Sequence, residues 1–404
     1  MPGFDRPGQR GNFLIRPKQL SALALVAFIA VFAVACGGSD DSDTGSSETW
    51  KIGLEAPLSG DLAVLGDGML KGAQQAAAEI NGDGGLLDRE IEIVPIDDAG
   101  DPATGVTAAN KAIKAGLDGV VGPYNSGVGL ETLPLYIKDG LVPIRLTSDD
   151  ATNGLGFTLQ PMTYQIAPVA SEAMTKWLDA KTVAIAYDET EAYTTTEAKS
   201  VRSELEKAGV DVVAYEPIKP GAADYSAEVS KLSATNADVV YLVTYFPEGG
   251  LIAKEMNDTN VKSQCLADYG AYDTGFIETA GVAAAKACPV VGVPAPGDFE
   301  GSTAFVDTFS EEFGQDPGTW SPYTYDSVNF LADGVEAAGG FDSAKLTEEL
   351  NKVDGWTGWT GDVTINPENG TREPGTVAIV STNADGDFQV DSDWASAVGA
   401  PFGE

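Results

Sequence analysis

The sequence predicts an α/β protein built from two doubly wound lobes. Short apolar runs alternate with longer stretches of helical periodicity from Trp50 onward, and the same rhythm restarts near Pro168. Alternation of this kind is typical of parallel sheets covered by helices. A length of 404 residues leaves room for two or three compact units.

The individual elements follow from the apolar pattern. For the first lobe we expect strands at 51–54, 91–94, 119–122 and 142–144, and helices at 68–80, 104–115 and 127–139. For the second we expect strands at 182–187, 210–215 and 239–244, and helices at 168–180, 196–208 and 225–235. Further helices are expected at 251–260, 299–313 and 323–339, and turn residues at 361–362 and 369–370 indicate a hairpin.

The N-terminus has the layout of a bacterial lipoprotein precursor. A short basic region precedes an uncharged apolar run at 20–35, which ends in small residues directly before Cys36. The alternative, an uncleaved membrane helix, normally needs about 20 apolar residues, and this run is shorter. We therefore expect cleavage after residue 35, a lipid anchor on Cys36 at the outer face of a bacterial membrane, and a flexible acidic tether at 36–49.

The chain is strongly acidic, with a formal net charge of −37. Removal of residues 1–35 takes away four basic residues and one acidic residue, which brings the charge to −40. Such a surface repels phosphates, so nucleic acid is excluded as a partner. The acidity itself is typical of a soluble surface outside the cell.

The composition also limits the chemistry. The chain has no histidine, which excludes Ser-His-Asp and Cys-His schemes and histidine-ligated zinc. Outside the cytoplasm Cys265 and Cys288 could form a disulfide, and two separate buried thiols are the alternative. Other suggestive patterns have plainer explanations: the glycines at 66–72 do not have dinucleotide-loop spacing, and the acidic segment 97–101 is expected to be a solvated turn.

Two loops that follow strands carry polar groups suited to a charged ligand. The loop 122–127 opens a helix, so its hydroxyl and backbone N–H groups can face an anionic head group. The later strand ends at Asp149, whose carboxylate could pair with an ammonium group or could cap a helix. Ligands of doubly wound sheets bind beyond the carboxyl ends of the strands, where both loops lie.

The sequence resembles the branched-chain amino acid (leucine/isoleucine/valine) binding protein family over nearly all of 50–398. The motifs that carry the resemblance are Ile52-Gly53-Leu54-Glu55-Ala56-Pro57-Leu58-Ser59-Gly60, Gly66-Asp67, Gly72-Ala73-Gln74-Gln75-Ala76, Ile80-Asn81, Gly84-Gly85-Leu86-Leu87, Asp97-Asp98-Ala99-Gly100-Asp101-Pro102 and Val121-Gly122. The resemblance implies a type I periplasmic binding protein fold with three segments joining the lobes. Lobe one would comprise 50–161 and 295–372, and lobe two 162–294 and 373–404.

The resemblance also implies a set of ligand contacts. Ser126 matches the serine that binds a ligand carboxylate, and the strand end beyond it supplies three further positions. The family's acidic partner for the ligand amine corresponds to Tyr269 when the family motif is followed in strict register. A shift of one residue places Asp268 there instead. All the implied contacts are Leu65, Ser126, Thr147, Ser148, Asp149, Tyr193, Tyr245, Asp268, Tyr269 and Trp320. For Trp320 a role as a core aromatic is an equal alternative.

The function that this resemblance implies is the solute receptor of an ABC importer. Such a receptor is a monomer without cofactors that binds an amino acid or similar metabolite in the cleft between its lobes and delivers it to a permease. It is not an enzyme. A lipid-anchored sensor for the same ligands is one alternative, and a secreted hydrolase with a carboxylate pair is another, because such hydrolases need no histidine.

The lipoprotein interpretation makes a direct prediction about Cys36. Because the thiol is the acylation site, Cys36→Ala should leave the precursor uncleaved and without lipid. Incorporation of a fatty-acid probe into the wild type and the variant measures this. Equal labelling of the two would show that the lipid is attached elsewhere.

Overall fold

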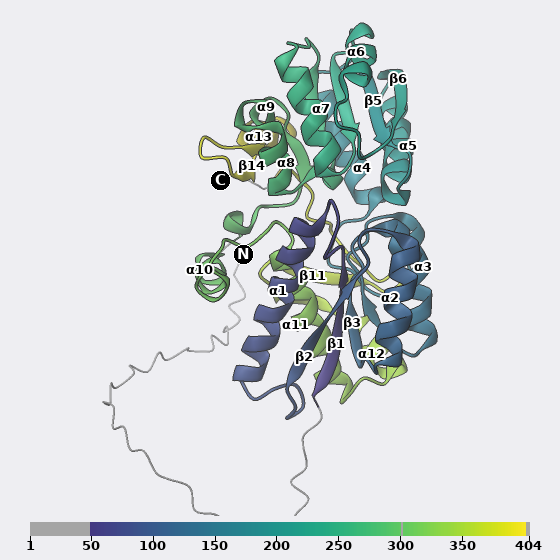
Figure 1. Cartoon of the computed structure of the whole chain (residues 1–404), viewed down its shortest axis with the longest axis vertical. Coiled ribbons are helices and arrows are strands. Elements are labelled where there is room, and N and C mark those ends of the chain that lie inside the picture. The colour runs from purple at the N-terminus through teal and green to yellow at the C-terminus, as the bar shows by residue number, and fades with distance from the viewer. Residues whose placement is uncertain (1–48, 300–301, 401–404) are drawn as a thin grey trace, which may run out of the picture. The chain divides into compact units, whose positions relative to one another are not determined.

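The structure, a computed structural model, describes residues 49–299 and 302–400, which form three β-sheets and the helices that cover them (Figure 1). The expected signal peptide, Cys36 and tether residues 36–48 lie outside the described residues. We call the parts of the chain built on the four-stranded sheet lobe one, and those built on the seven-stranded sheet lobe two. None of the helices described is both long and apolar enough to cross a membrane.

Lobe one is built on four parallel strands in the order β2-β1-β3-β4. Its strands are β1 (Trp50–Ala56), β2 (Ile91–Asp97), β3 (Gly119–Val121) and β4 (Pro143–Ile144). Its helices are α1 (Ala63–Gly82), α2 (Pro102–Lys114), α3 (Ser126–Lys138), α10 (Ser302–Phe313), α11 (Ser321–Ala338) and α12 (Ser343–Leu350). In Figure 1, α1 and α11 lie on one side of strands β1–β3 and α2 and α3 on the other. Helices on both faces confirm the predicted α/β class for this lobe.

The glycines of α1 allow it to pack closely against α11. A Cβ atom on Gly72 would lie 2.3 Å from the backbone oxygen of Ser321, which is too close for any other residue. The Ser321 hydroxyl donates a hydrogen bond of 2.8 Å to the backbone oxygen of Gly68. The glycine-rich segment is therefore a helix contact.

Lobe two is built on a seven-stranded sheet in the order β14-β13-β9-β8-β7-β5-β6. Strands β5 (Thr182–Asp188), β6 (Asp211–Ile218), β7 (Val239–Val243), β8 (Gln264–Ala267) and β9 (Val290–Gly292) are parallel. Strands β13 (Ala378–Thr382) and β14 (Phe388–Val390) add an antiparallel edge. All five residues of β7 are buried, as expected of a central parallel strand with both faces covered.

Most helices of lobe two connect successive strands. They are α4 (Thr163–Glu172), its π-helical continuation η2 (Ala173–Trp177), α5 (Ala192–Lys207), α6 (Ser226–Ala234), α7 (Phe246–Asp258), α8 (Thr274–Ala280), α9 (Val282–Ala287) and α13 (Ser392–Val398). Short 3-10 turns, η1 (Asp150–Thr152), η3 (Tyr269–Ala271) and η4 (Pro296–Asp298), lie in the connecting segments. The chain passes between the two large sheets three times: after β4, after β9 and before β13.

A small antiparallel sheet completes lobe one. It consists of β10 (Asp354–Gly358), β11 (Gly361–Asn366) and β12 (Thr371–Arg372), joined by tight turns. The turn residues at 361–362 and 369–370 lie in this region, so the predicted hairpin is present.

Two acidic side chains are buried at the carboxyl ends of β1 and β2. Glu55 and Asp98 both have no exposed surface, and Glu55 accepts a hydrogen bond of 3.0 Å from the Thr132 hydroxyl. Asp98 accepts one of 2.8 Å from the backbone N–H of Gly100. The expectation of a solvated turn was therefore wrong for Asp98, because helices α2 and α3 cover this position. Burial raises the pKa of Asp98 to about 7 and that of Glu55 well above its usual range.

This burial predicts a pH-dependent gain of stability in Asp98→Asn. An unfolded Asp has a pKa near 3.9. Ionisation of the buried Asp98 therefore destabilises the folded state above pH 7, and this destabilisation disappears as the pH falls towards 4. The amide keeps the oxygen that Gly100 uses. We expect the variant to be more stable by on the order of 1–3 kcal/mol at pH 8 and equal to wild type at pH 4.

Chemical denaturation at the two pH values measures this difference. The exposed Asp101, which caps α2, offers a matched control, because Asp101→Asn removes a charge that is not buried. A loss of stability in Asp98→Asn at pH 8 would contradict the prediction.

Candidate ligand-binding cleft

A small cavity lies where loops from both lobes meet. Every part of its lining follows the carboxyl end of a parallel strand, which is where ligands of doubly wound sheets bind. The lining residues are Tyr124, Ser126, Leu146 and Ser148 from lobe one, and Tyr193, Tyr245, Tyr269 and Gly270 from lobe two. The cavity volume is about 10 Å³, close to the space of one water molecule. An amino acid can therefore enter only if the two walls move apart.

Ser126 organises the lobe-one wall. It is the first residue of α3, and its Oγ accepts hydrogen bonds from the backbone N–H groups of Ser148 (3.3 Å) and Asp149 (3.1 Å). These bonds join the loop after β3 to the loop after β4. One hydroxyl and two N–H groups thus converge at one point, and this donor set suits a carboxylate.

Asp149 caps a helical turn and also reaches lobe two. Its Oδ1 accepts from the backbone N–H of Ala151 at 2.8 Å, and its Oδ2 accepts from the Thr196 hydroxyl at 2.9 Å. The side chain is 2% exposed and stands behind the cavity lining. The cap that the sequence left open is present, and the carboxylate adds negative charge beside the cavity.

A buried carboxylate supports the tyrosines of the lobe-two wall. Asp268 accepts hydrogen bonds from the hydroxyls of Tyr193, at 2.8 Å, and of Tyr241, and a longer one of 3.4 Å from the Gly270 N–H. Because the Tyr193 hydrogen is directed at Asp268, the lone pairs of this phenol are available on the cavity side. Asp268 is fully buried and is itself shielded from the cavity. Burial raises its pKa, and the hydrogen bonds oppose this shift.

Glu197 lies on the same helix as Tyr193 and is fully buried. Neither carboxylate oxygen has a hydrogen-bond partner among the described residues. Burial, followed by the negative charge of Asp268, raises the pKa of Glu197 well above its usual value, which favours the neutral acid.

Aromatic rings close the cleft behind these polar groups. Trp320, at the start of α11, lies 5.6 Å from the ring of Tyr124 and 5.2 Å from that of Tyr269. The rings of Tyr124 and Tyr245 are 6.3 Å apart. Trp320 is 1% exposed and is not part of the cavity lining, so here it packs as a core aromatic between the lobes.

The structure brings half of the expected contact residues to the cavity. Ser126, Ser148, Tyr193, Tyr245 and Tyr269 line it. The others lie behind the lining or in the core: Leu65 within α1, Thr147 bonded to Thr152 at 2.8 Å, Asp149, Asp268 and Trp320.

Sequence reasoning missed three lining residues, Tyr124, Leu146 and Gly270. Each lies within two residues of an expected contact on the same post-strand loop. Their position in these post-strand loops was the sequence feature that could have identified them as lining residues.

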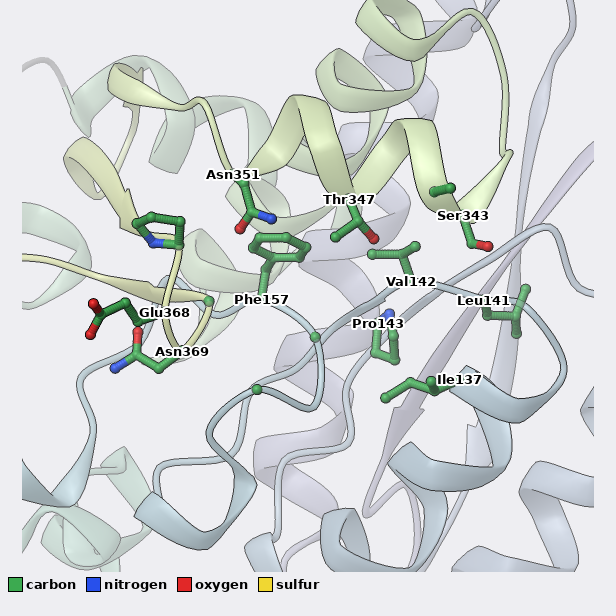
Figure 2. A pocket seen from close by; sticks show the side chains of 15 residues that line it. Ile137, Leu141, Val142, Pro143, Phe157, Ser343, Thr347, Asn351, Glu368 and Asn369 are labelled. Atoms are coloured by element: carbon green, nitrogen blue, oxygen red, sulfur yellow. The ribbon is translucent and has the colours of Figure 1, made fainter.

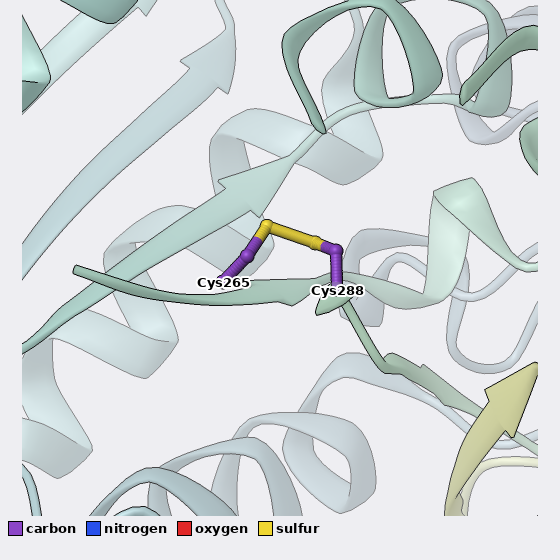
Figure 3. Close-up of a disulfide and its surroundings, with 2 residues drawn as sticks. All are labelled: Cys265 and Cys288. Carbon is purple, nitrogen blue, oxygen red and sulfur yellow. A yellow bond between two sulfur atoms is a disulfide. The ribbon is translucent and has the colours of Figure 1, made fainter. Parts of the chain in front are cut away.

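A disulfide fixes the strand that carries Asp268 and Tyr269. Cys265 in β8 is bonded to Cys288, just before β9, with the two Cα atoms 4.6 Å apart (Figure 3). The bond joins neighbouring strands of the lobe-two sheet. It therefore stabilises the base of the loop that forms one wall of the cavity.

A larger cavity lies elsewhere, in lobe one. It has a volume of about 490 Å³ and is lined by the region of β4, by α12 and by the turn before β12. Figure 2 shows Phe157 and Val142 on one side, facing Asn351 and Thr347. None of the expected contact residues lines it, so the smaller cavity is the candidate site.

Comparison with known proteins identifies the family. A family model described as periplasmic binding protein matches residues 49–387. The chain belongs to the periplasmic binding protein family. This membership confirms the resemblance seen in the sequence.

Similar proteins are named as amino acid binding proteins, and those with solved structures share the fold of this chain. The Leu/Ile/Val-binding protein homolog 1 of Brucella abortus (strain 2308) is 29% identical over 371 residues, which cover 90% of this chain and 95% of that protein. LivJ of Streptococcus pneumoniae, a branched-chain amino acid transporter substrate binding protein solved with isoleucine, is 25% identical, with a TM-score of 0.76 and coverage of 85% and 99%.

The leucine binding protein LivK of Thermotoga maritima has a TM-score of 0.78 at 23% identity, and the match covers 85% of this chain and 98% of that chain. These structural matches confirm the two-lobed periplasmic binding protein fold.

Proposed function

We propose that this periplasmic binding protein is the receptor of an ABC importer, anchored by lipid on Cys36. It binds one amino acid, branched-chain or similar, in the cavity between its lobes and presents it to a membrane permease. The observation that carries this proposal is the convergence of post-strand loops from both lobes on one cavity. A ligand held by both walls stabilises the closed form, which a permease can recognise.

The two walls suit the two ends of an amino acid head group. The ligand carboxylate accepts from the Ser126 hydroxyl and from the N–H groups of Ser148 and Asp149, which now share the Ser126 oxygen. The ammonium group donates to the Tyr193 phenol, whose hydrogen is held by Asp268. The rings of Tyr124, Tyr245 and Tyr269 contact the apolar side chain.

The lining supports binding without reaction. Hydroxyl groups, aromatic rings and backbone groups make up the wall, and the chain has no histidine to activate a hydroxyl. No bond of the ligand changes in this proposal. Release follows when the lobes separate again.

Binding of an amino acid is directly measurable. A soluble form that begins at Gly37 should bind one amino acid per monomer by isothermal calorimetry and return it unchanged by mass spectrometry. A thermal-shift screen of amino acids, amides and small acids selects the ligand, since binding to the folded state raises its melting temperature. Conversion of the ligand, or no ligand among these compounds, would overturn the proposal.

Two variants test the ends of the head group separately. Ser126→Ala removes a hydrogen bond to a charged carboxylate, worth about 1.5–3 kcal/mol, so zwitterions and simple carboxylic acids should both bind roughly ten- to a hundredfold more weakly. Asp149→Asn keeps the cap, because an amide oxygen caps equally well, but removes the negative charge. Amine-bearing ligands should therefore lose affinity relative to their deaminated analogues.

Titrating each variant with leucine and with 4-methylpentanoate, its analogue without the amine, measures both effects. If Asp149→Asn binds both compounds as the wild type does, the charge of Asp149 has no part in ligand recognition.

A further inference from the structure

A carboxylate from lobe two occupies the N-terminus of a helix in lobe one. Oε1 of Glu191 accepts a hydrogen bond of 2.8 Å from the backbone N–H of Gly127, the second residue of α3. Oε2 of the same side chain accepts one of 2.6 Å from the N–H of Tyr193, near the start of α5. One carboxylate thus caps two helices that belong to different lobes.

The local sequence of α3 leaves this position open for Glu191. Asn125 precedes the helix, where asparagine usually caps, but its side chain makes no capping hydrogen bond, and its buried Oδ1 has no partner among the described residues. A Cβ atom at position 127 would lie 2.9 Å from Oε1 of Glu191, so glycine allows the carboxylate to approach. The helix receives its cap from across the cleft.

The N-terminus of α3 is also the place where the donors for a ligand anion lie. Ser126, beside Gly127, lines the cavity, and a helix N-terminus favours negative charge. The charge of Glu191 also acts on the cavity: it raises the pKa of two lining phenols, Tyr124 and Tyr245, in addition to the larger effect of burial. Glu191 therefore supplies an anion next to the ligand.

We propose that Glu191 is a specificity-determining residue, an internal anion that fills the Gly127 position of α3 and leaves only the Ser126 position for a ligand carboxylate. Ligands with one anionic group are accepted, and those with a second anionic group near α3 are rejected. The inference rests on the proposed function for its ligand, whereas the occupied helix N-terminus is independent of the ligand's identity.

The groups around Glu191 shift the pKa of its carboxyl, so a pH titration can follow its protonation. Burial raises its pKa to about 7, the hydrogen bonds from Gly127 and Tyr193 oppose this, and the charges of Asp188 and Asp149 raise it further. Asp188 ends β5 and Asp149 follows β4, while the phenols of Tyr124 and Tyr245 face the same space. No ion pair joins Glu191 to a lysine or arginine within 49–299 and 302–400.

The test follows the backbone amide of Gly127 by NMR in protein labelled with [15N]glycine, in the chain from Gly37 onward. In the wild type this amide should shift with a midpoint near pH 7, as Glu191 gains its proton. In Glu191→Gln, which keeps an acceptor oxygen but cannot titrate, this transition should be absent. A transition that persists unchanged in Glu191→Gln would overturn the assignment.

Acetate then serves as a minimal carboxylate probe. At pH 8, above the pKa of about 7 of Glu191, Glu191→Ala should open the Gly127 position, so acetate should shift the Gly127 amide saturably in this variant and by less in the wild type, where only the Ser126 position is open. Glu189→Ala is the matched control, because Glu189 is an exposed acid on the same loop, and it should behave as the wild type. Equal acetate responses in wild type and Glu191→Ala, or none in a folded Glu191→Ala, would overturn the proposal.

These outcomes separate the two proposals. A failed amino acid screen with the expected Gly127 response would remove the proposed ligand and keep the role of Glu191. A successful screen without that response would do the reverse. Circular dichroism of each variant establishes that it is folded, and Glu191→Gln remains informative if Glu191→Ala does not fold.

Discussion

Hydrogen bonds hold the first and third connecting segments between the lobes together. The hydroxyl of Tyr164, on α4, bonds to Thr371 and Glu373 at 2.9 Å each. The next residue, Gln165, accepts from the Met162 N–H and donates to the Arg372 oxygen. One helical turn therefore contacts both segments that leave lobe one.

The order of the elements was predictable because parallel strands covered on both faces are continuous apolar runs, as in Val239–Val243. Helix starts were predicted less well. Helix α1 begins at Ala63 and α4 at Thr163, whereas the expected helices began at 68 and 168. Glycine and proline disfavour helix interiors, yet packing against α11 accommodates the glycines of α1, and α4 includes Pro168 before its π-helical turn. In α1, a tertiary contact overrode local propensity.

The candidate site was predictable only along the chain. Residues that follow a strand could be identified: Ser126 from its place in a loop that opens a helix, and Tyr245 from the family resemblance. The partner across the cleft could not: Glu191 and Gly127 are 64 residues apart, and Tyr193 and Asp268 are 75 apart. No local pattern encodes which acid meets which donor. The sequence also could not show that Asp268 faces two phenols.

Because the cavity is too small for an amino acid, ligand affinity is the difference between the contacts that the walls make with each other and those that they make with the ligand. The ring contacts of Trp320 and the hydrogen bonds of Glu191 and Asp149 already join the walls. A ligand must part these groups to enter and must then re-form most of them around itself. Because the carboxylates on this path lose solvation each time the cleft closes, a ligand that brings a positive charge offsets part of that cost, whereas a second anion adds to it. In the proposed function, the carboxylates behind the cavity lining thus favour an amine-bearing ligand before any specific contact is counted.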